Sequence, residues 1–185
     1  MLVNYGSGNP THDNDFMEAA PSLVRMLATH PGMRLRIMGQ LSLPLAFAPC
    51  SERIERYPLM PFANYFALLA ESNITIAPLR PLKFNDAKSN IKFLEAAILG
   101  LPIICSPRAH YALVVRLGEN GMLAERDEAW FAALLALASD GSLRRRIGRR
   151  ALISVGSRYS LGTVARTQVL PLLQTLATNS TSHNV

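Results

Sequence analysis

The stretch Lys88-Ser-Asn-Ile-Lys-Phe-Leu-Glu-Ala-Ala-Ile-Leu-Gly-Leu-Pro-Ile-Ile-Cys-Ser106 combines a polar loop, an amphipathic helix and an apolar strand. Its apolar residues recur at helical spacing, and we expect Ser89 to cap the start of the helix and Gly100 to end it. The run Ile103–Cys105 that follows is typical of a buried strand. A helix that leads directly into a buried strand is characteristic of parallel β-α-β units.

The rest of the chain repeats this alternation of short apolar runs and helical patterns. The expected strands are Val3–Tyr5, Arg34–Met38, Arg53–Tyr57, Ile74–Ala77 and Ile103–Cys105, with a weaker one at Gly121–Ala124. The pattern predicts an α/β fold, a Rossmann-like doubly wound parallel sheet of about six strands with helices on both faces. Such sheets bind ligands at the carboxyl ends of their strands, so the loops after the strands are the expected place for a site.

The first helix is expected to follow the loop after Tyr5. Asp15 and Glu18 have the spacing of a capping box, and Pro21 predicts a kink or a late start. Later helices are expected near Tyr65–Leu69, from Asp127 to Ala138, over Leu143–Val155, broken at Gly148, and over Val164–Leu176, where Pro171 interrupts. We divide the chain into a Rossmann-like domain (1–160), a C-terminal helix (161–177) and a disordered tail (178–185).

Composition excludes several classes of protein. A chain of 185 residues with 49% hydrophobic residues is long and apolar enough for one globular domain. Its apolar runs fall short of the roughly 20 residues that span a bilayer, and its first residues do not resemble a signal peptide. We therefore expect a cytoplasmic protein in which Cys50 and Cys105 remain free thiols.

The net charge of +6 is distributed unevenly. Residues 141–185 contain seven arginines and no acidic residue, so their charge is +7. Because the whole chain has a net charge of +6, the first 140 residues sum to −1. A nearly neutral body with a basic end, and without interleaved aromatic and basic residues, does not favour a nucleic-acid partner.

Gly6, Ser7 and Gly8 leave the first expected strand in the sequence Tyr5-Gly-Ser-Gly-Asn-Pro10. Glycines at such a place let a phosphate approach the backbone closely. The segment lacks the third glycine of a dinucleotide site and the Gly-Lys-Ser/Thr ending of a P-loop, so it supports neither NAD nor ATP chemistry. An ordinary tight turn explains these residues equally well.

Lys88, Lys92 and Glu95 are spaced four and three residues apart, so they can line one side of a helix. Glu95 falls at the edge of the face that packs on the sheet, where a carboxylate needs a hydrogen-bond partner. The two hydroxyls of a ribose would satisfy it, and Lys88 with the helix N-terminus would attract a diphosphate. A solvated Lys92–Glu95 pair, contributing less than about 1 kcal/mol, is the alternative interpretation.

The segment from Lys88 to Ser106 resembles the core motif of the group 1 (family 4) retaining glycosyltransferases. The order of other segments agrees with this resemblance, which extends over about residues 2–160. The matching segments are Tyr5–Gly8 with Thr11–Phe16 for the first loop and helix, Ile74–Leu79 for the strand before the motif, and Gly118–Leu123 for the "G-x-N-G-x-L" turn after it. The resemblance implies the C-terminal half of a two-domain GT-B fold, which holds the nucleotide of an activated sugar.

By the same resemblance, Glu95 would bind the ribose, and Ser89 and Asn90 would offer backbone N–H groups to the diphosphate. Leu59 and Met60 would hold the base through backbone groups. No catalytic residue, cofactor or metal is implied. The expected nucleotide-sugar-binding residues are Gly6, Ser7, Gly8, His12, Leu59, Met60, Lys88, Ser89, Asn90, Lys92 and Glu95.

Three departures from the family pattern stand out. The family often has a glutamate where this chain has Ala87, with Asp86 adjacent but not equivalent. The family also supplies an arginine and a lysine to the phosphates from the first loop, which here offers only His12, so Lys88 is the expected substitute. As the third departure, we expect the N-terminal acceptor domain to be absent from this chain, and without it we expect transfer to fail because donor and acceptor are not positioned.

The implied partner is a UDP-, GDP- or dTDP-linked sugar, used in polysaccharide or glycolipid synthesis. The Arg144–Arg150 run is either a solvated face or a peripheral contact with anionic lipid at the inner face of the membrane. Leu170, Leu173 and Leu176 would form an apolar patch that drives homodimerisation. Two alternatives remain: a non-catalytic nucleotide-sugar-binding or partner protein with the same fold, and an unrelated Rossmann-like protein.

Overall fold

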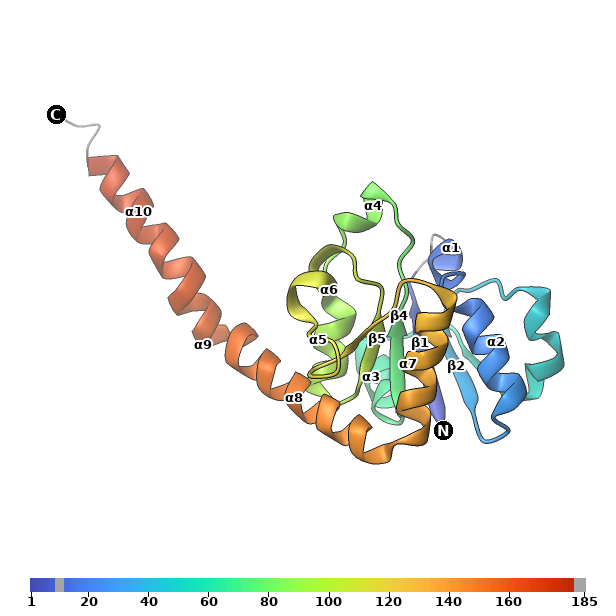
Figure 1. Ribbon diagram of the computed structural model, residues 1–185. Coiled ribbons are helices and arrows are strands. Elements are labelled where there is room, and N and C mark those ends of the chain that lie inside the picture. The colour runs from blue at the N-terminus through green and yellow to red at the C-terminus, as the bar shows by residue number, and fades with distance from the viewer. Residues whose placement is uncertain (9–11, 182–185) are drawn as a thin grey trace. The chain divides into compact units, whose positions relative to one another are not determined.

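The computed structural model describes residues 1–8 and 12–181, and the chain divides into two compact units, Met1–Leu152 and Ile153–Val185. In the first unit, six strands form one parallel sheet in the order β3-β2-β1-β4-β5-β6 (Figure 1). The strands are β1 (Leu2–Ser7), β2 (Arg34–Gly39), β3 (Ile54–Tyr57), β4 (Ile74–Ala77), β5 (Ile103–Cys105) and β6 (Met122–Leu123). All six predicted strands are therefore confirmed.

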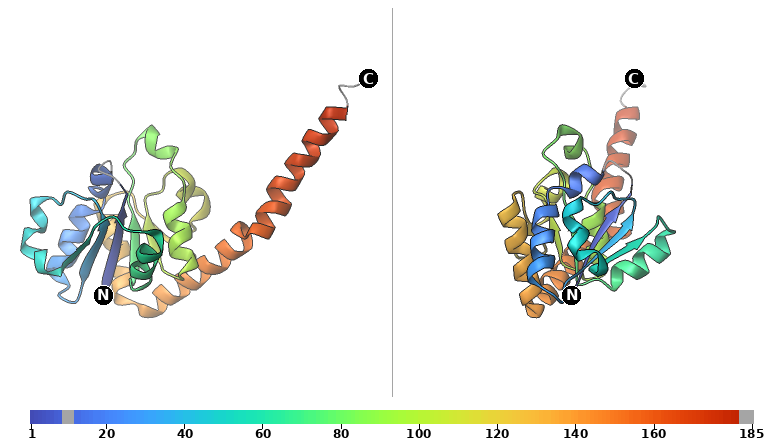
Figure 2. Two further views of the ribbon diagram at one scale, coloured as in Figure 1. Left: turned by 180° about the vertical axis from the view of Figure 1, so that it is seen from behind. Right: turned by 90° about the vertical axis from the view of Figure 1, so that its right-hand side faces the viewer.

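Helices cover both faces of this sheet, as the sequence predicts. The helices of the first unit are α1 (His12–Phe16), α2 (Ala20–Thr29), the 3-10 helix η1 (Leu45–Arg53), α3 (Phe62–Ala70), α4 (Lys83–Asp86), α5 (Ile91–Ile98), α6 (Ala109–Val114), α7 (Asp127–Ser139) and most of α8 (Gly141–Tyr159). Helices α2 and α7 pack against each other, and Figure 2 shows them on one side of the sheet with α3 on the other. This confirms the doubly wound α/β architecture.

Two helix caps differ from the prediction. Asp15 and Glu18 do not form a capping box, because Asp15 lies inside α1 and its carboxylate binds donors from distant segments. The late start at Pro21 is confirmed, since α2 begins at Ala20 with the proline in its first turn. Asn90, not Ser89, occupies the N-cap of α5, and its backbone oxygen accepts the first helical hydrogen bonds.

Two glycines of the first unit act at the end of α5. Gly100 has a φ of +66°, the left-handed conformation that ends a helix, as predicted. Gly148 does not break α8, which runs continuously from Gly141 to Tyr159. A Cβ on Gly148 would lie 1.8 Å from the Gly100 carbonyl oxygen, so the glycine allows α8 to pack directly on the end of α5.

The second unit is helical. It contains α9 (Leu161–Val164), the π-helical segment η2 (Ala165–Val169) and α10 (Leu170–Thr181). The predicted interruption takes the form of η2, which ends two residues before Pro171; a wider π turn accommodates a proline that cannot make the regular hydrogen bond. The predicted disordered tail begins within α10, and residues 182–185 lie outside the described part of the chain.

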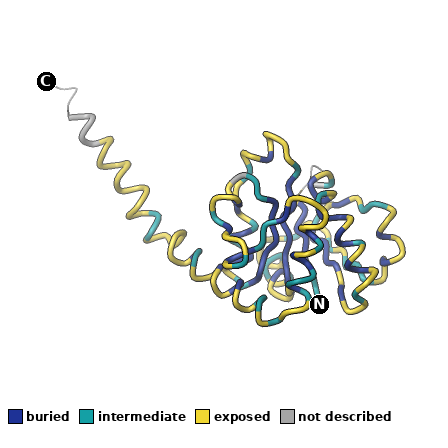
Figure 3. Tube along the Cα trace, viewed as in Figure 1, coloured by how far each residue is buried: buried dark blue, intermediate teal, exposed yellow. Residues whose placement is uncertain are grey.

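Side chains of the second unit are mostly exposed, in contrast to the buried strands of the first (Figure 3). The predicted apolar patch of Leu170, Leu173 and Leu176 is about half-exposed. None of the helices in the described part of the chain combines the length and hydropathy that a bilayer span requires.

Candidate functional site

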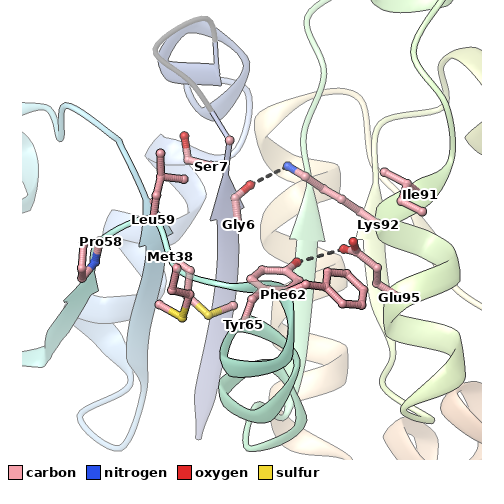
Figure 4. Close-up of a pocket in the computed structure, with 13 residues that line it drawn as sticks. Gly6, Ser7, Met38, Pro58, Leu59, Phe62, Tyr65, Ile91, Lys92 and Glu95 are labelled. Atoms are coloured by element: carbon pink, nitrogen blue, oxygen red, sulfur yellow. Dashed lines mark hydrogen bonds between the residues drawn. The ribbon is translucent and has the colours of Figure 1, made fainter.

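The strand order of the sheet reverses between β1 and β4, because the chain moves from β1 toward β2 on one side and from β4 toward β5 on the other. In doubly wound sheets this switch point opens a crevice at the carboxyl ends of the strands. A cavity of about 300 Å³ lies there (Figure 4). Its lining residues are Gly6, Ser7, Gly8, Met38, Gly39, Pro58, Leu59, Met60, Phe62, Tyr65, Ile91, Lys92 and Glu95.

Two glycines near the carboxyl ends of neighbouring strands, Gly6 in β1 and Gly39 in β2, line this first cavity. Gly39 has a φ of +105°, and a Cβ there would lie 1.7 Å from the Ser7 carbonyl oxygen. A Cβ on Gly6 would lie 3.1 Å from the Tyr65 hydroxyl oxygen. The glycines therefore let the β1 and β2 ends and the Tyr65 ring approach one another.

Glu95 projects from α5 into the first cavity and meets Tyr65 of α3. The Tyr65 hydroxyl donates to Glu95 Oε2 at 2.9 Å. Burial raises the pKa of Glu95, although the hydrogen bond from Tyr65 and the charge of Lys92 act in the opposite direction. The same burial, together with the charge of Glu95, raises the pKa of Tyr65, so its hydroxyl keeps its proton.

Helix α3 is held in place by Arg36, a buried residue of β2. Its guanidinium donates to Glu55 Oε2 at 2.7 Å on β3 and to the Leu68 carbonyl oxygen at 2.7 Å at the end of α3. It also pairs with Glu71 at 2.8 Å. This network fixes the helix that carries Tyr65.

Lys92 lies one helical turn before Glu95 and bridges α5 to β1. Its Nζ donates to the Gly6 carbonyl oxygen at 2.6 Å and lies 4.8 Å from the Tyr5 ring centroid. Burial, supported by the nearby charge of Lys88, lowers the pKa of Lys92 to about 8. The interpretation of Lys92 and Glu95 as a solvated surface pair is therefore wrong, because each side chain is directed into the protein and bonds to another group.

A second cavity of about 220 Å³ adjoins the first. The two share Ile91 and Lys92. The lining residues of the second cavity are Tyr5, Asp15, Ala77, Pro78, Leu79, Lys88, Ser89, Ile91, Lys92 and Tyr111. It lies at the carboxyl end of β4, directly beside the start of α5.

Asp15 and Lys88 form an ion pair in the wall of the second cavity, with 2.6 Å between Oδ2 and Nζ. Asp15 Oδ1 also accepts from the Arg80 backbone N–H at 3.0 Å and from Asn85 Nδ2 at 2.7 Å. Burial alone would raise the pKa of Asp15, but these hydrogen bonds and the Lys88 charge lower it. Asp15 is therefore an ionised carboxylate at neutral pH.

The structure brings most of the predicted site residues together. Those around the first cavity are Gly6, Ser7, Gly8, Leu59, Met60, Lys92 and Glu95, and those around the second are Lys88, Ser89 and Lys92. Asn90 is buried at the N-cap of α5 and lines neither cavity. The side chain of His12 lies outside the described residues.

Sequence reasoning missed Tyr65 and Asp15. The sequence pattern predicts only a helix near Tyr65 and only a helix cap at Asp15. Their partners lie 30 and 73 residues away along the chain, so no local spacing reveals them. A signal for Asp15 was present, because a carboxylate flanked by Phe16 and followed by an apolar helix needs donors if it is buried.

The sheet, its switch point and the adjoining cavities define a doubly wound α/β domain with a candidate ligand site at the strand ends. The family described as "Glycosyl transferases group 1" matches residues 8–140, and the chain belongs to this family of transferases. The prediction from the motif order is thereby confirmed. No curated protein sequence matches the chain significantly.

Solved structures share the fold at low sequence identity. The C-terminal domain of the group 1 glycosyl transferase LpcC from Francisella tularensis has a TM-score of 0.64 at 19% identity, over 86% of this chain and 86% of that chain. Alr3699/HepE from Anabaena, solved with UDP and glucose, has a TM-score of 0.71 at 15% identity, over 94% of this chain and 48% of its own. WaaG, a glycosyltransferase involved in lipopolysaccharide biosynthesis, has a TM-score of 0.67 at 16% identity, over 85% of this chain and 43% of its own. The chain thus spans less than half the length of HepE and WaaG.

Proposed function

We propose that this chain is the donor-binding domain of a hexosyltransferase that moves a sugar from a nucleotide diphosphate to an acceptor. The observation that carries the proposal is the convergence of Glu95 and Lys92 on the cavity at the strand switch point. One supplies a carboxylate for a diol and the other a buried ammonium for an anion. A second cavity beside Lys92 leaves room for the transferred group.

In this proposal the first cavity takes the nucleoside. Glu95 accepts hydrogen bonds from the ribose hydroxyls, which replace the hydrogen bond that it now accepts from Tyr65. The base lies toward the apolar end of the cavity, beside Leu59, Met60 and Phe62. UDP is the first nucleotide to test, because HepE was solved with UDP.

The diphosphate would lie between the two cavities, where Lys92 is shared. The N-terminus of α5, with the backbone of Ser89 and Asn90, and the Lys92 ammonium favour an anion at this place. These groups are fixed before the ligand arrives. They would therefore stabilise the negative charge that develops on the departing diphosphate.

Lys88 contributes less directly than the sequence suggests. Its ammonium pairs with Asp15, so a diphosphate has to compete with that carboxylate for it. Lys92 is therefore the principal cation in this proposal, and Lys88 the second. The Gly6–Gly8 segment would lie beside the phosphates, where it contributes backbone groups but no charged side chain.

The acceptor in this proposal is a polysaccharide or glycolipid precursor, by analogy with WaaG. It would be held by an N-terminal acceptor domain of the GT-B type, and the chain alone would be inactive because only the donor is positioned. Arg145, Arg146, Arg149 and Arg150 are exposed on the outer side of α8. We include a peripheral contact of this face with anionic lipid in the proposal, testable by sedimentation with anionic and neutral vesicles.

The test of donor binding is calorimetric titration of the full chain with UDP, GDP and dTDP. We expect one of them, UDP first, to bind, and Glu95→Ala to weaken it by about 30-fold or more, because a charged hydrogen-bond partner is lost. Glu52→Gln, an exposed carboxylate of η1, is the matched control and should bind as the wild type does. Binding of none of the three nucleotides by the wild type would contradict the proposal.

A non-catalytic partner protein with the same fold is the second candidate, and Ala87 is the observation that favours it. Ala87 is exposed and supplies no carboxylate where relatives of the motif often have one. Transferase activity after addition of a separately produced acceptor-binding domain would support the enzyme. Nucleotide-sugar binding without any transfer in that mixture would support the partner protein.

A further inference from the structure

Asp15 is the carboxylate of the second cavity. It is only 4% exposed, and it lines the cavity together with Lys88, Ser89 and Lys92. The two residues directly before the motif, Asp86 and Ala87, are exposed and do not line the second cavity. Whatever enters the second cavity therefore meets the charge of Asp15.

The geometry of Asp15 leaves part of its carboxylate available. Oδ1 holds two donors, the Arg80 backbone N–H and Asn85 Nδ2, which fix the orientation of the group. Among the residues that the structure describes, Oδ2 accepts from one side chain, Lys88 Nζ. A carboxylate offers about four acceptor positions, so Oδ2 can accept one more hydrogen bond from a ligand hydroxyl.

Lys88 is not permanently committed to Asp15. Its side chain is 22% exposed and lines the same cavity. A phosphate that enters there competes with Asp15 for the ammonium, and it is also repelled by the Asp15 charge. Asp15 therefore weakens phosphate binding in two ways: it holds the Lys88 ammonium, and its own charge repels the phosphate.

We propose that Asp15 makes this site select a nucleotide-diphosphate sugar over the free nucleotide diphosphate. The inference rests on the proposed function. A free terminal phosphate loses a second proton near pH 6, so it brings an additional negative charge at neutral pH. In the sugar nucleotide this oxygen is esterified, and sugar hydroxyls stand where that charge would be. Asp15 repels the additional charge of the free diphosphate and accepts a hydrogen bond from a sugar hydroxyl. This difference favours release of the nucleotide diphosphate after transfer.

The experiment is titration of the full chain and its Asp15→Asn variant with UDP, UDP-glucose and UDP-N-acetylglucosamine. Asparagine has the same shape, and its oxygen can keep both donors of Oδ1 while its amide releases Lys88. We expect UDP to bind about tenfold more tightly to Asp15→Asn, and the preference for the better sugar nucleotide over UDP to fall by at least that factor. Unchanged or weaker UDP binding in Asp15→Asn would overturn the inference.

Asn85→Ala is the matched control, because it removes one hydrogen bond to Asp15 and leaves the charge in place. It should not tighten UDP binding. If it tightens UDP as much as Asp15→Asn does, loosening of the loop rather than removal of charge is responsible, and the inference is overturned.

Lys88→Met tests the same coupling from the other partner and serves if Asp15→Asn does not fold. It leaves Asp15 charged and without its ammonium, so UDP should be weakened more than the sugar nucleotides. Equal weakening of all ligands would contradict a selective role of Asp15. Failure of the proposed function is separate: the wild type would then bind no nucleotide, whereas failure of this inference alone leaves Glu95-dependent UDP binding intact.

Discussion

Glu95 and Asp15 lie at the same edge of the sheet, but their surroundings move their pKa values in opposite directions. Burial is the largest influence on both and raises both. Glu95 receives one hydrogen bond from a neutral phenol, which is too little to offset burial, so its pKa stays raised. Asp15 receives three donors, one of them an ammonium, and its pKa is lowered.

This difference separates an exchangeable carboxylate from a fixed one. In the proposed complex, Glu95 would replace the Tyr65 hydroxyl with a ribose hydroxyl at little cost, because one neutral donor replaces another. Asp15 is tied to a backbone N–H, an amide and an ammonium from the stretch 80–88, so it keeps its position and its charge. Two carboxylates with different roles thus arise from different sets of donors.

The largest expected effect comes from removing the charge of Asp15. Because its folded-state pKa is lowered, its contribution to stability is present above its unfolded pKa and is lost as pH falls through the folded value. We expect Asp15→Asn to lower the free energy of unfolding by about 2 kcal/mol at pH 7, and by progressively less toward pH 3. Urea unfolding at a series of pH values measures this.

Glu95→Gln supplies the opposite case in the same experiment. In the wild type, the raised pKa of Glu95 means that the folded state holds the proton more tightly than the unfolded state. The wild type therefore gains stability from this carboxyl group as pH falls. The stability difference between Glu95→Gln and wild type should therefore change with pH in the opposite direction from that of Asp15→Asn. Parallel pH profiles for the two variants would refute the contrast between the carboxylates.

The sequence is sufficient to predict the sheet but not this contrast. Strands and helices follow from local periodicity, and the parallel direction of the strands follows from the helices that connect them. The position of Glu95 and Lys92 is predictable for the same reason, since both lie on one helix next to a recognisable strand. The donors that distinguish the carboxylates come from other elements, and Tyr65 and Asn85 are assigned to them only once the fold is known.

Lys92 connects the two carboxylates, and its lowered pKa gives the next largest effect. With a pKa of about 8, its ammonium is largely present at pH 7 and is lost as pH rises above that value. UDP affinity should therefore fall about tenfold or more between pH 7 and pH 9.5, because the anion loses its buried cation. Calorimetry in buffers of different ionisation enthalpy would also detect the proton taken up on binding above pH 8.

Substitution separates this titration from other groups. Lys92→Arg keeps its charge throughout that range, so its UDP affinity should be nearly independent of pH between 7 and 9.5. Lys92→Met should bind weakly at every pH. A pH dependence that persists unchanged in Lys92→Arg would assign the titration to a different group.

The smallest expected effect is that of Tyr65→Phe, which removes the present partner of Glu95 and keeps the ring beside Gly6. We expect a loss of about 1 kcal/mol in the free energy of unfolding, because a half-buried carboxylate loses a hydrogen bond. UDP affinity should change less than about threefold, because in the complex the ribose supplies the donor in place of Tyr65. Thermal unfolding and calorimetry measure the two quantities on the same sample. A loss of UDP affinity as large as that of Glu95→Ala would show that Tyr65 itself binds the nucleotide. It would contradict the exchange of the Tyr65 hydroxyl for a ribose hydroxyl on Glu95.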